Sequence, residues 1–184
     1  MRKIALLALC LLSLSACNSS PVVPPIVETP TLFTSDFAEV CNATPLPEAA
    51  AYTEEAGIHP VILFDRMQQE PYLERSFALA ENWQVDWQEA EKYQLVSCVS
   101  FTPKEKSGTC DFDVEGETYT LDLYPATYTV DLYAAQSGAK LASTSLDLPA
   151  AECPSMHYFT EKTEAYYPDY IPALSTFLTP YVQK

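Results

Sequence analysis

The chain has 184 residues and a formal net charge of −15, with 25 acidic residues against 10 basic ones. A nucleic-acid-binding domain would carry clustered Lys and Arg, so this charge argues against nucleic acid as a partner. It also disfavours direct docking of the domain on anionic lipid headgroups. The charge is typical of a self-repelling surface, or of one that attracts cations and basic partners.

The first residues have the pattern of an export signal. Arg2 and Lys3 provide a positive start, and residues 4–14 are almost wholly apolar. This apolar run is shorter than the roughly 20 residues that a membrane-spanning helix requires. A charged start, a short apolar run and small residues at its end are typical of a secretory signal. We therefore predict that residues 1–16 are a signal peptide.

A four-residue motif ends this segment: Leu14, Ser15, Ala16 and Cys17. The motif resembles the lipobox of bacterial lipoproteins. The resemblance implies a diacylglycerol on the Cys17 thiol, cleavage just before Cys17 and usually acylation of the new amino group. Two or more acyl chains hold a protein stably at a membrane. The alternatives are an ordinary cleaved signal, which would release the mature protein, and a retained membrane helix.

The resemblance also bears on location. Asn18 follows the cysteine, whereas Asp at this position would retain such a protein in the inner membrane of enteric-type bacteria. We expect an extracytoplasmic protein anchored to the outer membrane where the host has one, or to the cell membrane. The lipidated N-terminus and a proline-rich tether then occupy residues 17–34, because the prolines favour extended polyproline II chain. Residues 35–184 are predicted to form a single globular α+β domain.

Four cysteines remain once Cys10 is removed with the signal and Cys17 is lipidated; they are Cys41, Cys98, Cys110 and Cys153. An even number of cysteines in an exported protein indicates disulfides. Of the three possible connectivities we favour Cys98–Cys110, on adjacent strands of a predicted hairpin, which leaves Cys41–Cys153. Zinc is the alternative, although the usual short C-x-x-C pairs are missing.

Helical patterns are most frequent in the first half of the domain. We expect a helical turn from residue 35 or 36, a helix over 47–55, a buried strand over 58–64 and a helix over 71–82. The helix over 71–82 would place Leu73, Phe77 and Ala80 on one face. Trp83 and Trp87 fit either a helix or an alternating strand, so residues 83–93 stay ambiguous.

Strand patterns follow, at residues 94–101, 109–114, 117–124, 126–135 and 139–146. A final helix is predicted from Asp169, with an apolar stripe that ends at Tyr181 and with Pro180 expected to end or kink it. The predicted fold class is α+β: an antiparallel β-meander of about five or six strands, with short helices and a C-terminal helix packed on the sheet, stabilised by disulfides.

One acidic cluster matches the first half of an EF-hand calcium loop, with a glycine at the sixth position. Its oxygen-bearing residues are Asp111, Asp113, Glu115 and Asp122. The twelfth position should be Glu rather than Asp122, and no convincing helices flank the loop. The same residues are typical of a half-exposed strand before a hairpin turn. Ca²⁺ is therefore a candidate cofactor, with a plain β-hairpin as the alternative.

Other catalytic patterns are weak. The two histidines, His59 and His157, have no zinc-hydrolase spacing, and His59 is expected to make a local structural hydrogen bond. The sequence contains no G-x-S-x-G nucleophile elbow. Acidic residues are numerous enough for a catalytic carboxylate pair, but the sequence does not select one.

Tyrosine is abundant, with twelve residues. One group lies on the predicted hairpins (Tyr119, Tyr124, Tyr128 and Tyr133) and the other precedes the last helix (Tyr158, Tyr166, Tyr167 and Tyr170). Tyrosine is an ordinary half-buried strand residue, and it also suits recognition surfaces.

The leading functional hypothesis is a lipid-anchored cell-envelope protein that acts as a non-catalytic binding or interaction module. Its partner would be an unknown envelope protein or a small ligand, in addition to the membrane that holds the N-terminal lipid. The alternative is a carboxylate-dependent hydrolase that acts on envelope glycans or peptides. A deep cleft with two carboxylates of raised pKa would favour the hydrolase, and a tyrosine-rich face would favour the binding module.

Overall fold

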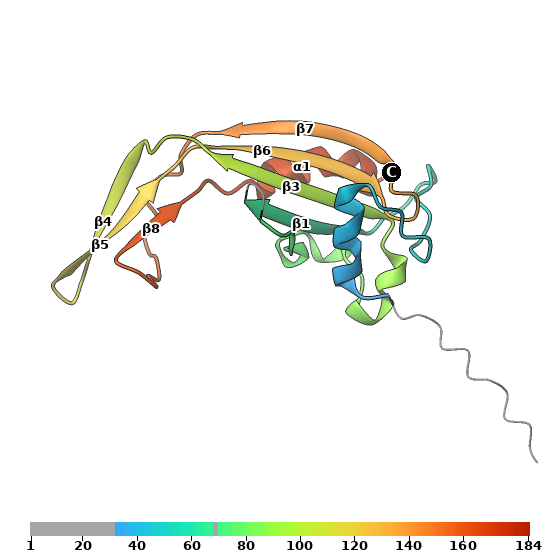
Figure 1. The fold of residues 1–184 in the computed structure, drawn as a ribbon, viewed down its shortest axis with the longest axis horizontal. Helices are drawn as coiled ribbons and strands as arrows, with labels where there is room; N and C mark the ends of the chain where they lie inside the picture. The colour runs from blue at the N-terminus through green and yellow to red at the C-terminus, as the bar shows by residue number, and fades with distance from the viewer. Residues whose placement is uncertain (1–31, 68–69) are drawn as a thin grey trace, which may run out of the picture. The chain divides into compact units, whose positions relative to one another are not determined.

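The computed structural model describes residues 32–67 and 70–184 (Figure 1). The predicted signal peptide, Cys17 and residues 18–31 of the predicted tether lie outside this part of the chain. The described residues have an α+β fold, as predicted, with two β-sheets, several short 3-10 helices and an α-helix. Within these residues, no helix has both the length and the apolar character needed to cross a membrane.

The larger sheet has five strands in the order β2-β1-β3-β6-β7 (Figure 1). Its strands are β1 (Val61–Met67), β2 (Leu73–Glu74), β3 (Leu95–Pro103), β6 (Ala126–Ala134) and β7 (Lys140–Leu148). β1 runs parallel to β3, whereas the other pairs are antiparallel. The sheet is therefore mixed. Of the predicted antiparallel meander, it contains the hairpin of β6 and β7. Parallel strands need a long crossover, which the chain between β1 and β3 provides.

The smaller sheet has the order β4-β5-β8 and contains β4 (Gly108–Val114), β5 (Glu117–Leu123) and β8 (Thr163–Tyr166). β4 pairs with β5, whereas the predicted hairpin that joins residues 94–101 to 109–114 is wrong, because β3 pairs with β6 and β1 instead. The reason is burial: residues 95–99 of β3 are buried on both faces, whereas Asp111 and Asp113 of β4 are exposed. A central position in the larger sheet suits β6, whose Val130 and Leu132 are fully buried.

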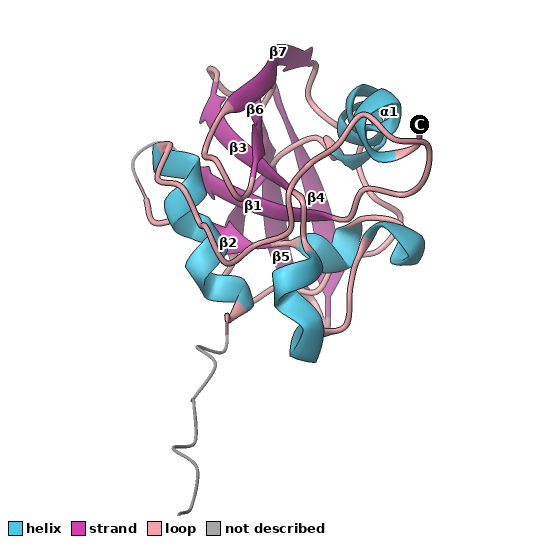
Figure 2. Cartoon of the chain, turned by 90° about the vertical axis from the view of Figure 1, so that its right-hand side faces the viewer, coloured by secondary structure: helices cyan, strands magenta, loops and turns pink. Residues whose placement is uncertain are grey.

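Helices cover both faces of the larger sheet (Figure 2). On one face lies α1 (Ile171–Val182), which buries Leu174, Leu178 and Val182 in a core that includes Val61 and Leu63. The predicted C-terminal helix is thus confirmed, and Asp169 Oδ1 accepts the N–H of Ile171 at 2.9 Å at its start. Pro180 lies inside the helix, which ends two residues later.

The opposite face is covered by two 3-10 helices, η1 (Thr34–Asn42) and η4 (Trp87–Lys92). Phe37 and Val40 of η1 and Ala90 of η4 belong to one core cluster, which also contains Ile62 and Val96 of the sheet. The ambiguous tryptophans separate: Trp83 is buried, whereas Trp87 is exposed.

Two predicted helices are wrong. Residues 47–55 form turns and irregular chain, and residues 71–82 form β2 and the short 3-10 helices η2 (Ser76–Ala78) and η3 (Glu81–Trp83). In the second case the backbone N–H of Arg75 donates to the carbonyl of Leu63 at 2.8 Å, and the N–H of Leu63 donates to Ser76 Oγ at 3.1 Å. Pairing with the edge of β1 therefore overrides helix propensity here.

The four cysteines form two disulfides, Cys41–Cys98 and Cys110–Cys153. The expectation of disulfides is confirmed, but the favoured pairing, Cys98–Cys110 with Cys41–Cys153, is wrong. Cys98 lies opposite Asp131 in the larger sheet and Cys110 lies opposite Leu121 in the smaller one, so they are not on one hairpin. Disulfides persist in oxidising compartments, which indicates an extracytoplasmic domain.

Candidate functional site

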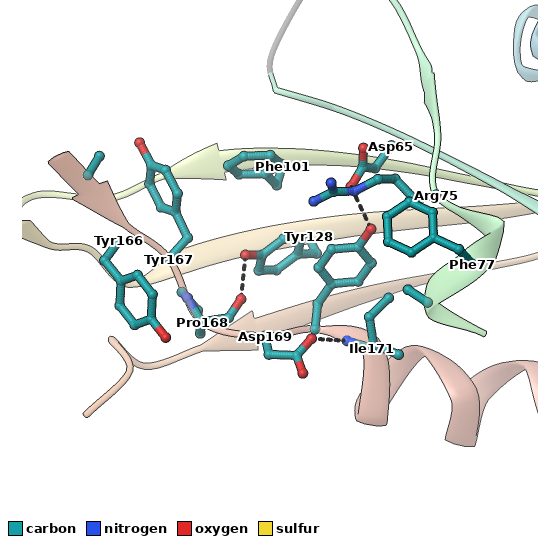
Figure 3. A pocket seen from close by; sticks show the side chains of 13 residues that line it. Asp65, Arg75, Phe77, Phe101, Tyr128, Tyr166, Tyr167, Pro168, Asp169 and Ile171 are labelled. Atoms are coloured by element: carbon teal, nitrogen blue, oxygen red, sulfur yellow. Dashed lines mark hydrogen bonds and ion pairs between the residues drawn. The ribbon is translucent and has the colours of Figure 1, made fainter. Parts of the chain in front are cut away.

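A cavity of about 570 Å³ opens at the edge of the core on the α1 side of the larger sheet (Figure 3). Its walls come from β1, β3 and β6, from residues at η2, and from the segment of residues 165–171 that joins β8 to α1. A volume of this size is typical of sites for small molecules. The cavity is therefore built from segments that are distant in the sequence.

A buried carboxylate lies at the centre of its polar wall. Asp65 is on the same side of β1 as Val61 and Leu63, and its side chain is only 11% exposed. Its Oδ2 accepts the hydroxyl of Tyr170 at 2.7 Å and Nε–H of Arg75 at 3.2 Å. A buried charge is tolerated only when it is paired and hydrogen-bonded, which these two partners accomplish. Burial, followed by the hydrogen bond with Asp65, raises the pKa of Tyr170 far above its ordinary value.

Arg75 presents the rest of its guanidinium to the cavity. The bond from Nε to Asp65 orients the group, and Figure 3 shows it extending towards the ring of Phe101. This bond is the only hydrogen bond that the guanidinium makes with the described residues. Its terminal nitrogens are therefore available as donors. Its Cζ also lies 5.7 Å from the ring centroid of Phe77, which is 75% exposed at the rim.

Three rings form a stacked wall. Phe101 stacks on Tyr128 with centroids 5.3 Å apart, and Tyr128 stacks on Tyr170 with centroids 4.7 Å apart. The hydroxyl of Tyr128 donates to the carbonyl of Pro168 at 2.8 Å. Burial, with a contribution from the nearby carboxylates, raises the pKa of Tyr128 to about 12. Since the hydroxyls of both tyrosines are held by hydrogen bonds, the wall is fixed before any ligand arrives.

The stacked wall continues towards the smaller sheet. The ring of Tyr167 meets Phe101 edge-on with centroids 5.3 Å apart, and it lies 5.6 Å from the ring of Tyr124. Tyr166 and Tyr167 are both half-buried and line the cavity. These rings give the cavity open aromatic surface beside its polar wall.

The proposed calcium ligands lie elsewhere, on the β4–β5 hairpin, and the hairpin interpretation is the one that the structure shows. Asp111 accepts from Thr120 Oγ1 at 2.8 Å, and Asp113 accepts the N–H of Gly116 at 3.1 Å. Asp122 pairs with Lys106 at 3.3 Å. Glu115 and Gly116 both have positive φ, as a two-residue hairpin turn requires. The four carboxylates Asp111, Asp113, Glu115 and Asp122 are not brought together, and the described residues contain no cluster of three or more side chains suited to a metal.

Neither histidine lines the cavity. His59 is buried, with its ring nitrogens 2.8 Å from Gln94 Oε1 and 2.9 Å from the carbonyl of Glu55, which confirms the expected structural role. His157 lies 2.9 Å from Glu164 Oε2. That contact, with hydrogen bonds from the backbone of Glu161 and Thr160, holds the pKa of Glu164 at about 2. The His157–Glu164 pair therefore fastens the loop before β8.

The tyrosines are the part of the sequence-based site that the structure brings together. Tyr128 from the hairpin group lines the same cavity as Tyr166, Tyr167 and Tyr170 from the group before the last helix. Sequence reasoning missed Asp65, Arg75, Phe77 and Phe101. The available signal was Asp65, a charged residue directly after the apolar run Val61–Phe64, within what proved to be a buried strand.

Replacing Tyr170 with Phe should lower the free energy of unfolding by about 1–3 kcal/mol, because a buried carboxylate loses one of its two partners. The folded-state pKa of Tyr170 lies above its unfolded value of about 10, so the native state holds this proton more tightly and stability falls as the pH rises above about 10. Tyr170→Phe should make that alkaline fall shallower. Urea unfolding at several pH values measures both effects.

The matched control is Tyr158→Phe, at a ring that is 86% exposed and outside the cavity. It should change stability by less than about 0.5 kcal/mol. Equal effects of the two substitutions, or an unchanged alkaline slope in Tyr170→Phe, would contradict the assigned role of Tyr170.

No protein-family model, curated protein or solved structure matches this chain. Its function must therefore be inferred from the site itself. The site consists of a rigid aromatic wall, a buried carboxylate and an oriented arginine, arranged around one cavity.

Proposed function

We propose that this chain is a lipid-anchored, extracytoplasmic binding module, and that its ligand site is the cavity beside Tyr128 and Tyr170. The observation that carries the proposal is the pre-formed aromatic wall next to the oriented Arg75 guanidinium. Ligand sites are commonly apolar, aromatic hollows with a few fixed polar groups that set orientation. The cavity has this composition.

Rigidity of the site favours binding. Ordering side chains on association costs about 0.5–1.5 kcal/mol for each flexible group. The hydroxyls of Tyr128 and Tyr170 already have protein partners, and Arg75 is already fixed by Asp65. A ligand that enters this cavity would therefore lose little free energy to ordering.

The anchor in this proposal is supported by the lipobox-like motif that ends at Cys17 and by the two disulfides of an oxidising compartment. Fourteen residues, 18–31, lie between Cys17 and Leu32, the first described residue. Extended as polyproline II, they would span about 45 Å. Such a tether would let the domain reach partners at some distance from the lipid surface.

The hydrolase of envelope glycans or peptides is the second candidate, because two carboxylates, Asp65 and Asp169, line the cavity. Both have structural partners, however. Asp65 binds Tyr170 and Arg75, and Asp169 accepts the N–H of Ile171 at the start of α1. Both carboxylates therefore hold parts of the fold in place, so we favour binding as the function.

The binding proposal is testable without knowing the ligand. We expect members of a chemically diverse library of small soluble molecules to bind weakly, and to shift the NMR signals of the rings of Tyr128, Tyr166, Tyr167 and Tyr170. Small probes concentrate at true ligand sites because such sites combine apolar surface with fixed polar groups. Ala165→Trp should abolish the shifts, since Ala165 is exposed and lines the cavity.

The control is Ala51→Trp, at an exposed alanine outside the cavity lining. It should leave binding unchanged. The proposal that the cavity is the ligand site would be contradicted if the probes bound another surface. It would also be contradicted if they bound the Ala165→Trp variant with the same affinity as the parent protein.

Mass spectrometry of the native protein, with and without reduction, can test the proposed lipid on Cys17 and the two disulfides together. We expect the chain to begin at Cys17 with acyl and glyceryl mass on that residue. Non-reduced peptides should link Cys41 to Cys98 and Cys110 to Cys153. Cys17→Ser should release the exported protein from the membrane fraction. A native chain without acyl mass would eliminate the anchor but not the cavity.

A further inference from the structure

The charges that line the cavity are two carboxylates and one guanidinium, which sum to −1. Asp65 and Arg75 form an ion pair at 3.2 Å, and the third charged lining residue, Asp169, accepts the N–H of Ile171 at the start of α1. An anionic ligand would meet Asp169 and a chain with net charge −15. A cationic ligand would be attracted by the net charge of the chain, but inside the cavity it would meet the terminal nitrogens of Arg75. A neutral ligand avoids both conflicts.

The polar wall offers donors and an acceptor side by side. The terminal nitrogens of Arg75 donate, and both hydrogen bonds to Asp65 use Oδ2, so Oδ1 has no hydrogen-bond partner among the described residues. A hydroxyl group can donate to a carboxylate and accept from a guanidinium at the same time. Two neighbouring hydroxyls would satisfy this wall with charge-assisted hydrogen bonds on both sides.

Aromatic surface surrounds the polar wall. Phe77 exposes 75% of its area at the rim, and Tyr166 and Tyr167 are only half-buried. Large aromatic side chains dominate binding energies when a ligand covers them. The C–H face of a sugar ring is a flat apolar surface that can pack on such rings while its hydroxyls face Asp65 and Arg75.

We infer that the cavity binds a neutral saccharide, with neighbouring hydroxyls bridging Asp65 and Arg75 and with the sugar ring packed against Phe77. The inference names the ligand class of the proposed binding module, and it rests on that proposed function. A neutral saccharide combines the three features that the cavity favours: no net charge, paired hydroxyls and a flat apolar face.

The test uses the full mature chain in a non-ionic detergent that contains no sugar. Saturation-transfer NMR would compare neutral hexoses and N-acetylhexosamines with glucuronate and glucosamine, which are negatively and positively charged sugars of the same size. We expect the neutral sugars to bind best. Phe77→Ala should weaken their binding about tenfold, in line with the loss of one aromatic contact. Arg75→Gln should weaken it as well.

Tyr158→Ala is the matched control, because it removes an exposed ring outside the cavity and should leave binding unchanged. If Arg75→Gln destabilises the fold, Phe77→Ala still tests the inference, because Phe77 is largely exposed and its replacement should leave the fold intact. The inference is overturned when no neutral sugar binds, when a charged sugar binds better, or when Phe77→Ala binds as the parent does. Binding of another kind of molecule in the cavity would still satisfy the proposed function, so the two failures are distinguishable.

Discussion

The buried carboxylate of Asp65 is the constraint on which the site depends. It ends the buried stretch of β1, and it accepts hydrogen bonds from Tyr170 before α1 and from Arg75 before η2. Removing either partner would leave a buried charge poorly compensated, which is costly in a low-dielectric interior. The single carboxylate therefore fixes two distant segments against the same strand. The stacking of Tyr170 on Tyr128 and the orientation of Arg75 both follow from it.

The two disulfides lie outside the cavity and fix other parts of the chain. Cys41–Cys98 ties η1 to the central strand β3, on the face of the sheet opposite α1. Cys110–Cys153 ties β4 to the loop before β8, beside a cluster of few buried residues. Residues 165–171 leave this smaller sheet and enter α1, so the bridge helps to fix where the Tyr166–Tyr170 segment starts. The disulfides therefore hold η1 and β4 in place, whereas hydrogen bonds and ring stacking hold the wall of the cavity.

Local patterns predicted much of the fold, and long-range pairing was the part that they could not predict. A concentration of apolar residues identified the strand near 94–101, and alternation identified the strand near 126–135. The stripe through Leu174 and Leu178 identified α1. The disulfide pairing failed because it assumed that consecutive strands β3 and β4 are neighbours. The helix over 71–82 failed because edge pairing of Arg75 and Ser76 with Leu63 outweighs local propensity. Four tyrosines of the site were noticed in the sequence, whereas Arg75 and Asp65 acquire their roles only through contacts that the fold creates.

The central claim is that Asp65 and Tyr170 act as a coupled pair that organises the cavity. A double-mutant cycle with Asp65→Asn and Tyr170→Phe measures that coupling directly, from the free energies of unfolding of the four proteins. The account predicts a coupling energy of at least about 1 kcal/mol, as found for residues that share a hydrogen bond. Effects that add to within about 0.3 kcal/mol would contradict it, because independent residues behave in that way.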